Sequence, residues 1–224
     1  MTSDEPNVGL RGHRVRKVKH AEGRRRDVLL AAAKVFAKRG YWTTSIDQIA
    51  DELGLTKGVV YYYFSSKEEL LAEIQTSSLT EAMERLDAVV ARGGPVEEVL
   101  RSAIAEQIRN VVEGLDQYAV LLRDPHVLSE EKQHALRGTQ RRYERTIQGL
   151  IERGIADGVF GPGNPKLMAF TLLRGSLGVA NWYDPSGSWT TSEIVESVTS
   201  QLMRGILRAS DRGYTTQPDV PVQP

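Results

Sequence analysis

The stretch "TTSIDQIADELGLTKGVVYYYF", from Thr43 to Phe64, contains two short helical segments separated by a glycine-containing turn. Ser45 has a glutamine three residues later, the form of a helix capping box, and apolar positions at helical spacing follow as far as Gly54. Thr56 can cap a second short helix, from Lys57 to Tyr63. A helix, a turn of three or four residues with glycine, and a second helix together indicate a helix-turn-helix motif.

Four consecutive aromatic residues end this stretch, and a helix that turns about 100° per residue cannot point them all at one core. If Val60 points inward, Phe64 falls on the same side, within about 60°. Gly58, Tyr61 and Tyr62 fall between about 100° and 200° from Val60 and therefore face outward. An outward glycine between tyrosines permits close approach of a sugar-phosphate backbone or a base edge. The alternative is that both tyrosines pack against other helices of their own chain.

The composition of the chain narrows the function classes. Its 224 residues include no cysteine, which excludes disulfides, zinc fingers and thiol nucleophiles. No apolar run approaches the ~18 residues of a membrane span and no basic-then-apolar leader opens the chain, so we expect a soluble, cytoplasmic protein. The net charge is zero, yet residues 1–26 carry eight basic and three acidic side chains, a net +5. Such an arm indicates a polyanion bound at one end, although a solvated tail has the same composition.

Helical periodicity continues to the end of the chain, with no alternating strand pattern and no repeat. The sequence therefore predicts an all-α protein, with three helices of an N-terminal helix-turn-helix unit followed by a bundle of longer ones. The predicted helices after the motif cover residues 66–92, 96–113, 117–123, 129–157, 165–183 and 191–209.

The segment "TTSIDQIADELGLTKGVVYYYFSSKEELL", Thr43 to Leu71, closely resembles the DNA-binding segment of the tetracycline-repressor-like (TetR) family of bacterial regulators. The likeness extends back through "RRDVLLAAAKVFAKRGYWTTS" to about Arg24. It implies an all-helical homodimer in which each subunit presents its helix-turn-helix to one half of a palindromic operator, with a ligand domain behind. It also implies a repressor released from double-stranded DNA by a small molecule, with no enzyme activity, no cofactor and no membrane partner.

The resemblance gives the segments their roles. We expect a basic flexible arm at 1–20, a DNA-binding domain at 21–67, a ligand-binding and dimerisation domain at 68–213 and a disordered tail at 214–224. Four residues are expected to bind phosphates: Thr44, Thr56, Tyr62 and Lys67. Three are expected to meet base edges: Lys57, Gly58 and Tyr61. Ser45 completes the DNA-binding set. Tyr63 stands at a position where family members frequently have a histidine, and its angle places it nearer the inner side of the helix. It is therefore not included among the predicted DNA-binding residues.

The stretch "LMAFTLLRGSLGVANWY", Leu167 to Tyr183, is apolar nearly all round, which indicates a helix buried on more than one side. The helix after it also has apolar residues at helical spacing. We expect these two helices to form the dimer interface around a two-fold axis, the alternative being an intramolecular core. The interface prediction comprises Leu173, Leu177, Gly178, Ile194, Val198, Leu202 and Ile206.

The C-terminal half also resembles members of the family that sense acyl-coenzyme A thioesters in lipid or steroid breakdown. The matching stretches are "LSEEKQHALRGTQRRYERTIQGLIERGIADGVF" and "RGSLGVANWYDPSGSWTTSEIVESVTSQLMRGIL". This resemblance implies nucleotide phosphates on Arg141 and Arg145, and an acyl slot near Tyr118, Met168 and Phe170. The arginines could instead form a solvated helix face, and the ligand could be another apolar or aromatic molecule.

Arg174 and Trp182 belong to the same ligand prediction. Arg174 lies within the apolar stretch, and a buried guanidinium needs an anionic partner, either a carboxylate of the chain or an anionic ligand group. Trp182 could wall the pocket or fill the interface. A DNA-binding protein that senses nothing, and a helical-bundle enzyme, are the other function classes that the sequence leaves open.

A metal site is not predicted. His126, Glu130 and His134 are spaced four apart, but Pro125 and Ser129 interrupt any single helix that would align them.

Overall fold

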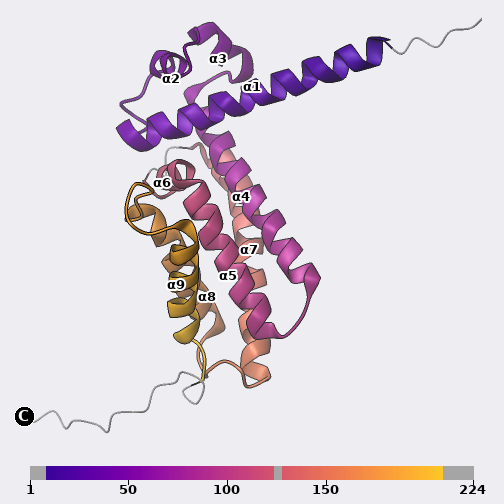
Figure 1. Cartoon of the computed structure of the whole chain (residues 1–224), viewed down its shortest axis with the longest axis vertical. Helices are drawn as coiled ribbons and strands as arrows, with labels where there is room; N and C mark the ends of the chain where they lie inside the picture. The colour runs from indigo at the N-terminus through magenta and orange to yellow at the C-terminus, as the bar shows by residue number, and fades with distance from the viewer. Residues whose placement is uncertain (1–8, 124–127, 209–224) are drawn as a thin grey trace, which may run out of the picture.

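The structure is a computed structural model that describes residues 9–123 and 128–208 (Figure 1). In these ranges the chain forms the helices α1 (Gly9–Arg39), α2 (Ile46–Glu52), α3 (Lys57–Tyr63), α4 (Lys67–Arg92), α5 (Val96–Glu113), α6 (Leu115–Arg123), α7 (Glu130–Ala156), α8 (Pro165–Leu177), the 3₁₀ helix η1 (Gly178–Asn181) and α9 (Thr191–Arg204). The all-α prediction is confirmed. None of the described helices is long and apolar enough to cross a membrane.

Three predicted boundaries differ from the structure by more than two residues. The helix predicted at 191–209 ends at Arg204. Helix α1 already begins at Gly9, so residues 9–20 are helical where a flexible arm was expected. The helix predicted to reach Tyr183 ends at Leu177, and the chain continues as the 3₁₀ helix η1 from Gly178. The remaining part of the predicted arm, residues 1–8, and the predicted tail, residues 214–224, lie outside the described residues.

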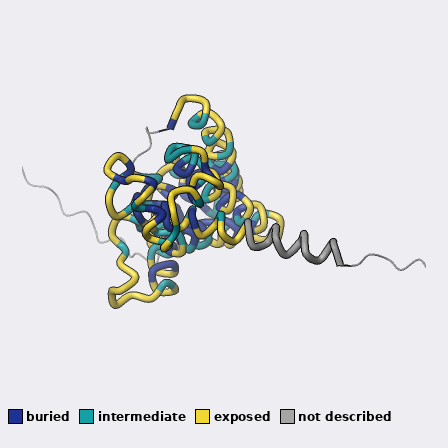
Figure 2. Tube along the Cα trace, turned by 90° about the horizontal axis from the view of Figure 1, so that it is seen from above, coloured by how far each residue is buried: buried dark blue, intermediate teal, exposed yellow. Residues whose placement is uncertain are grey.

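Two hydrophobic cores lie one beyond the other along the molecule. In Figure 1, α1 crosses the end of the bundle, and α2 and α3 lie on the side of α1 that faces away from the bundle. The first core combines apolar side chains of α1 to α3 and the first turns of α4 with Val120 and Leu128. The second combines α4 from Ala82 onward with α5, α7, α8 and α9. Figure 2 shows the buried residues gathered inside a shell of exposed ones.

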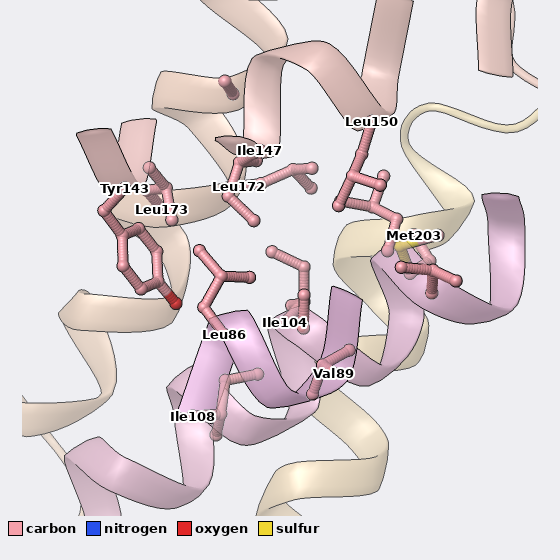
Figure 3. Close-up of a cluster of buried hydrophobic side chains, with 14 of the residues drawn as sticks. Leu86, Val89, Ile104, Ile108, Tyr143, Ile147, Leu150, Leu172, Leu173 and Met203 are labelled. Atoms are coloured by element: carbon pink, nitrogen blue, oxygen red, sulfur yellow. The ribbon is translucent and has the colours of Figure 1, made fainter. Parts of the chain in front are cut away.

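The second core is closely packed. Leu86, Ile104 and Ile147 are almost completely enclosed, and Figure 3 shows them with Leu172 and with Tyr143 at one side of the cluster. At the end of α7, a Cβ atom on residue 154 would lie 2.1 Å from the ring of Phe160. Only glycine fits there, which lets the chain turn back and pair Phe160 with Leu207 in an isolated antiparallel bridge.

Helix α4 takes part in both cores. Leu70, Leu71 and Ile74 belong to the first, and the stretch from Ala82 onward belongs to the second. Between them, at the level of Gln75 and Leu79, α4 contributes to neither core. We call this level the seam. Because α4 contributes to the first core as far as Ile74, the DNA-binding domain packs together with α4 beyond residue 67, its predicted end.

Candidate DNA-reading face and ligand cavity

The motif begins with the predicted capping box. The Ser45 hydroxyl oxygen accepts a hydrogen bond from the Gln48 N–H at 3.3 Å, and the Ser45 N–H donates to Gln48 Oε1 at 3.0 Å. Thr56 is the N-cap of α3, but its hydroxyl makes no capping hydrogen bond. Both residues are exposed, so both helix N-termini carry hydroxyl groups that can reach a phosphate.

Helix α3 separates an inner from an outer face as its angular count predicts. Val60 is fully buried in the first core, whereas Gly58 is exposed, Tyr61 is 50% exposed and Tyr62 is 79% exposed. A Cβ atom on residue 58 would meet only the Thr56 hydroxyl oxygen, at 3.8 Å, which is an ordinary contact. Packing within the protein therefore gives no reason for a glycine at this position.

Two predicted phosphate ligands are instead engaged inside the motif. The Lys67 ammonium donates to the carbonyls of Tyr41 and Thr44, each at 2.8 Å, and lies 4.3 Å from the centre of the Tyr41 ring. Burial lowers the pKa of Lys67. Thr44 is itself buried, and its hydroxyl donates to the Gly40 carbonyl at 2.8 Å. These side chains hold the turn before α2, which differs from the direct phosphate contacts expected for them.

Sequence reasoning missed Trp42, which lies in the turn before α2. Its side chain is 74% exposed and stands edge-on to the Tyr41 ring, with ring centres 5.2 Å apart. The feature of the sequence that could have identified Trp42 is its position directly before the two threonines that lead into α2. Lys57, by contrast, is exposed as expected, with its ammonium 3.8 Å from Asp47 Oδ1.

A cavity of about 340 Å³ lies at the seam, between α4, α5, α6, α7 and α8. Most of its wall is apolar. It is lined by Gln75, Leu79, Ala82, Gln107, Tyr118, Leu121, Leu122, Gln133, Leu136, Arg137, Gln140, Tyr143, Glu144, Phe170, Leu173, Arg174 and Leu177. Its volume is at the lower end of the ~300–1,000 Å³ typical of small-molecule sites.

Three of the predicted ligand residues, Tyr118, Phe170 and Arg174, line this cavity, and four do not: Arg141, Arg145, Met168 and Trp182. The two arginines lie on the exposed face of α7, beyond Arg137 and Gln140, which do line it. Met168 packs against the second core. Trp182 follows η1 and contacts Trp189 edge-on, with ring centres 6.4 Å apart.

Arg174 is exposed, so the expectation of a buried guanidinium is wrong. The inner face of α8 is formed by Leu172, Leu173 and Ser176, which leaves Arg174 at the rim of the cavity. It makes no ion pair within the described part of the chain. Arg137, also at the cavity, donates only to Gln133 Oε1, at 3.3 Å. Two guanidinium groups thus border an apolar cavity.

Deeper in the cavity lie four polar side chains that sequence reasoning did not bring together. Gln75 is 4% exposed and Gln107 is 5% exposed. Neither Gln75 Nε2 nor Gln107 Oε1 has a hydrogen-bond partner among the described residues. Burial raises the pKa of Tyr118 and of Tyr143, which keeps both phenols neutral. The signal was present in the sequence, because each glutamine occupies a position in the apolar stripe of its helix.

The predicted interface residues divide into two groups. Leu173, Ile194 and Ile206 are buried in the protomer's own second core, so they have no surface to offer a partner, contrary to their assignment. The other four are partly exposed: Leu177, Gly178, Val198 and Leu202. A Cβ atom on residue 175 would lie 2.7 Å from a methyl group of Leu202, which shows how closely α8 and α9 pack within one protomer.

A stripe of exposed residues follows the outer side of these helices. Leu167 is exposed near the start of α8, and Thr171 and Gly175 continue the line at helical spacing. Trp182, which follows η1, is also exposed. We call this stripe, together with Trp182, Val198 and Leu202, the α8–α9 surface.

Among the described residues no group of three or more possible ligands could hold a metal ion. His126, which the spacing argument considered, lies outside them.

Comparisons with known proteins agree with this architecture. Residues 28–74 match the family model of bacterial regulatory proteins of the tetR family, and residues 93–206 match that of the tetracyclin repressor-like C-terminal domain. The HTH-type transcriptional repressor KstR2 of Rhodococcus jostii (strain RHA1) is 28% identical over 186 residues, covering 82% of this chain and 91% of that protein.

Two solved structures extend the comparison. A TetR/AcrR-family transcriptional regulator from Thermobifida fusca is 34% identical, covers 83% of this chain and 100% of its own, and superposes with a TM-score of 0.64. AibR in complex with isovaleryl coenzyme A and operator DNA is 25% identical, with a TM-score of 0.72 and coverage of 80% of this chain and 98% of its own. KstR2 and the Thermobifida fusca protein are transcriptional regulators, and the family whose models match this chain is one of regulators and not of enzymes. The chain belongs to the tetR family of bacterial regulatory proteins and is a ligand-responsive, DNA-binding transcriptional regulator.

Proposed function

We propose that this protein is a homodimeric repressor that leaves a palindromic operator when an acyl-coenzyme A thioester occupies the cavity of its subunits. The observation that carries the proposal is the position of the cavity. It lies at the seam, and its walls include α4 and α6, two helices that also pack against the DNA-binding unit.

The chemistry of the cavity supports a thioester. An apolar interior of about 340 Å³ suits an acyl group but is small for a whole coenzyme A, so the nucleotide would lie outside. Arg137 and Arg174 at the rim can pair with its phosphates, since guanidinium groups bind phosphate in bidentate fashion. AibR was solved with isovaleryl coenzyme A, and a relative from Bacillus subtilis that is 23% identical is named a fatty acid metabolism regulator protein.

The route from cavity to DNA runs through two short connections. Arg123, at the end of α6, donates to the Ala37 carbonyl of α1 at 2.7 Å. Glu68, in the first turn of α4, accepts from the Ser129 N–H at 3.0 Å and lies 3.3 Å from the Lys132 ammonium. A ligand that displaces α4 or α6 therefore also moves the unit that carries α3. By thermodynamic linkage, a ligand that weakens operator binding is itself bound less tightly by the operator complex.

The exposed face of α3 supports a reading role in the major groove. Gly58, Tyr61 and Tyr62 together form an open surface with hydroxyl groups at its edges, and the Tyr62 ring stands edge-on to its neighbour Tyr63, with ring centres 4.9 Å apart. Dimers of this kind need half-sites about 34 Å apart or a multiple of that distance. A change of a few ångströms in the spacing of two recognition helices would end simultaneous docking, and with it the avidity of the dimer.

The α8–α9 surface is the proposed dimer interface. It presents Leu167 and Trp182 beside the partly exposed Val198 and Leu202, an apolar set that water would otherwise cover. Small residues in the same stripe permit close approach of helices from a second copy around a two-fold axis.

Fluorescence anisotropy with labelled promoter DNA at fixed salt tests the proposal. We expect specific binding over random DNA and release by at least one of isovaleryl-, octanoyl- and palmitoyl-coenzyme A, with free coenzyme A much less effective. The double variant Arg137→Gln/Arg174→Gln should weaken release by about 10-fold or more, because hydrogen bonds to charged groups contribute about 1.5–3 kcal/mol. Arg141→Gln, on the same α7 but outside the cavity, is the matched control and should respond like the unmodified protein.

Each part of the proposal can fail separately. Specific DNA binding without release by any thioester would refute the effector and leave the operator function. Equal loss in the double variant and in Arg141→Gln would refute the role of the rim arginines. Operator binding that is unchanged in Tyr61→Ala would refute the reading role of α3.

A further inference from the structure

We infer that the acyl group recognised by this protein carries a hydroxyl, and that Gln75 and Gln107 select it from plain hydrocarbon chains. The inference rests on the proposed function and deepens it, since it names the class of acyl group: hydroxyacyl in place of saturated acyl.

Two buried amide groups lie at the cavity without their full set of hydrogen bonds. Gln75 comes from α4 and Gln107 from α5, both line the cavity, and both are at least 95% buried. Gln75 Nε2, a donor, and Gln107 Oε1, an acceptor, have no partner among the described residues. Buried polar atoms in proteins are nearly always hydrogen-bonded, because leaving them unpaired costs free energy. Two orphaned amide atoms facing one cavity indicate that their partner is the molecule bound there.

The chemistry of the missing partner follows from the pair. One amide atom needs an acceptor and the other needs a donor, and a hydroxyl is the smallest group that supplies both. A saturated acyl chain supplies neither and would fill the cavity while both amides stay unpaired. A site built to hydrogen-bond a substrate hydroxyl discriminates far more strongly against the analogue without it than an apolar slot discriminates between chain lengths.

Two phenols reinforce the polar end of the cavity. Tyr118 on α6 and Tyr143 on α7 line it, and none of the hydrogen bonds within the described ranges involves either hydroxyl. Burial raises the pKa of each phenol, so they remain neutral groups that donate and accept. Arg137 and Arg174 are exposed at the rim, whereas these four side chains are buried. The hydroxyl is therefore recognised inside the cavity, away from the charged end of the ligand.

The test compares decanoyl-coenzyme A with 3-hydroxydecanoyl- and 10-hydroxydecanoyl-coenzyme A by isothermal titration calorimetry on the full chain. The same three acyl groups are also titrated as free acids. We expect at least one hydroxylated ligand of each series to bind at least tenfold more tightly than its saturated counterpart.

Three variants assign the preference to the amides. Gln75→Leu and Gln107→Leu keep the approximate volume and remove the orphaned atoms, so the preference should fall below twofold while decanoyl-coenzyme A binds no more weakly. The melting temperature of the ligand-free variants should stay the same or rise, because an unpaired buried polar group has been removed. Gln148→Leu, on α7 outside the cavity, should keep the full preference.

The outcomes separate this inference from the proposed function. Saturated ligands that bind as tightly as hydroxylated ones, or a preference that survives both cavity variants, would overturn the inference while leaving thioester sensing intact. A lower melting temperature with no change in preference would show that the amides are structural, and would also overturn it. A preference seen among the free acids while no thioester binds would support the hydroxyl inference and refute the coenzyme A part of the proposed function. Absence of binding in both series would overturn the inference.

Discussion

At the scale of single residues, Gly58 distinguishes the needs of folding from those of DNA binding. A methyl group there meets nothing closer than 3.8 Å, so the protein itself would accept alanine. We expect Gly58→Ala to raise stability by up to about 1 kcal/mol through helix propensity. It should nevertheless weaken operator binding by about tenfold or more, because the added methyl group keeps DNA away from the helix surface.

Thermal melts and operator titrations of one matched pair check this prediction. Gly138→Ala is the control, since Gly138 is an exposed glycine within α7 where an added methyl group would have no other atom within 4 Å. It should stabilise the protein similarly and leave operator binding unchanged. If Gly58→Ala bound the operator as well as Gly138→Ala, close approach of DNA at α3 would be excluded.

Lys67 gives a second prediction at this scale. Its ammonium already has two carbonyl partners and an aromatic ring, so Lys67→Met should destabilise the motif and reduce operator affinity without removing a phosphate contact. The slope of log K against log salt should therefore stay the same. If the magnitude of that slope fell by about 0.9, the value for a single neutralised phosphate, Lys67 would be a phosphate ligand after all.

These two residues also show what the sequence could reveal about the reading face. The outward direction of Tyr61 and Tyr62 follows from helix geometry alone, because the count involves only neighbours within one helix. The engagement of Lys67 does not, because its partners at Tyr41 and Thr44 are 26 and 23 residues away. Side chains whose roles depend on distant contacts can be predicted only once the helices are placed in space.

At the scale of helices, α6 is the element that joins sensing to DNA binding. It lines the cavity with Tyr118, Leu121 and Leu122 and reaches α1 through Arg123. We expect Arg123→Ala to keep operator affinity within about threefold while weakening ligand-induced release by about tenfold, because the link carries no DNA contact and one charge-assisted hydrogen bond is worth about 1.5–3 kcal/mol.

Anisotropy titrations with and without the effector measure both quantities. Arg101→Ala is a suitable control, since Arg101 pairs only with Glu97 of its own helix at 3.2 Å. Unchanged release in Arg123→Ala would mean that the signal reaches the motif through α4 alone.

The helices themselves were largely predictable, and their inner faces were not. Periodicity located every described α-helix. It could not show which side of α8 faces the protomer's own core, because apolar residues occur nearly all round this helix. Leu173 faces the protomer's own core, whereas Leu167 is exposed. The cavity was predicted only in part, since its wall combines five helices whose relative rotation is set by packing.

At the scale of the whole molecule, the α8–α9 surface predicts the assembly. Leu167→Arg places a charge on the α8–α9 surface and should convert a dimer to a monomer at micromolar concentration, as measured by analytical ultracentrifugation. Leu30→Arg, at an exposed leucine on α1, should leave the dimer intact. Identical sedimentation of the two variants would exclude this surface as the interface.

The seam has a calorimetric consequence. Helix α4 contributes to two separate cores, and to neither at the level of Gln75 and Leu79, so the two units of the ligand-free protein can lose their order at different temperatures. A bound acyl group would lie between them and touch both. We expect the heat-capacity curve to show two overlapping peaks without ligand and a single, sharper peak with it. The effector of such a protein then becomes part of its hydrophobic core. The cellular concentration of that effector therefore decides whether the repressor unfolds in two steps or in one cooperative step.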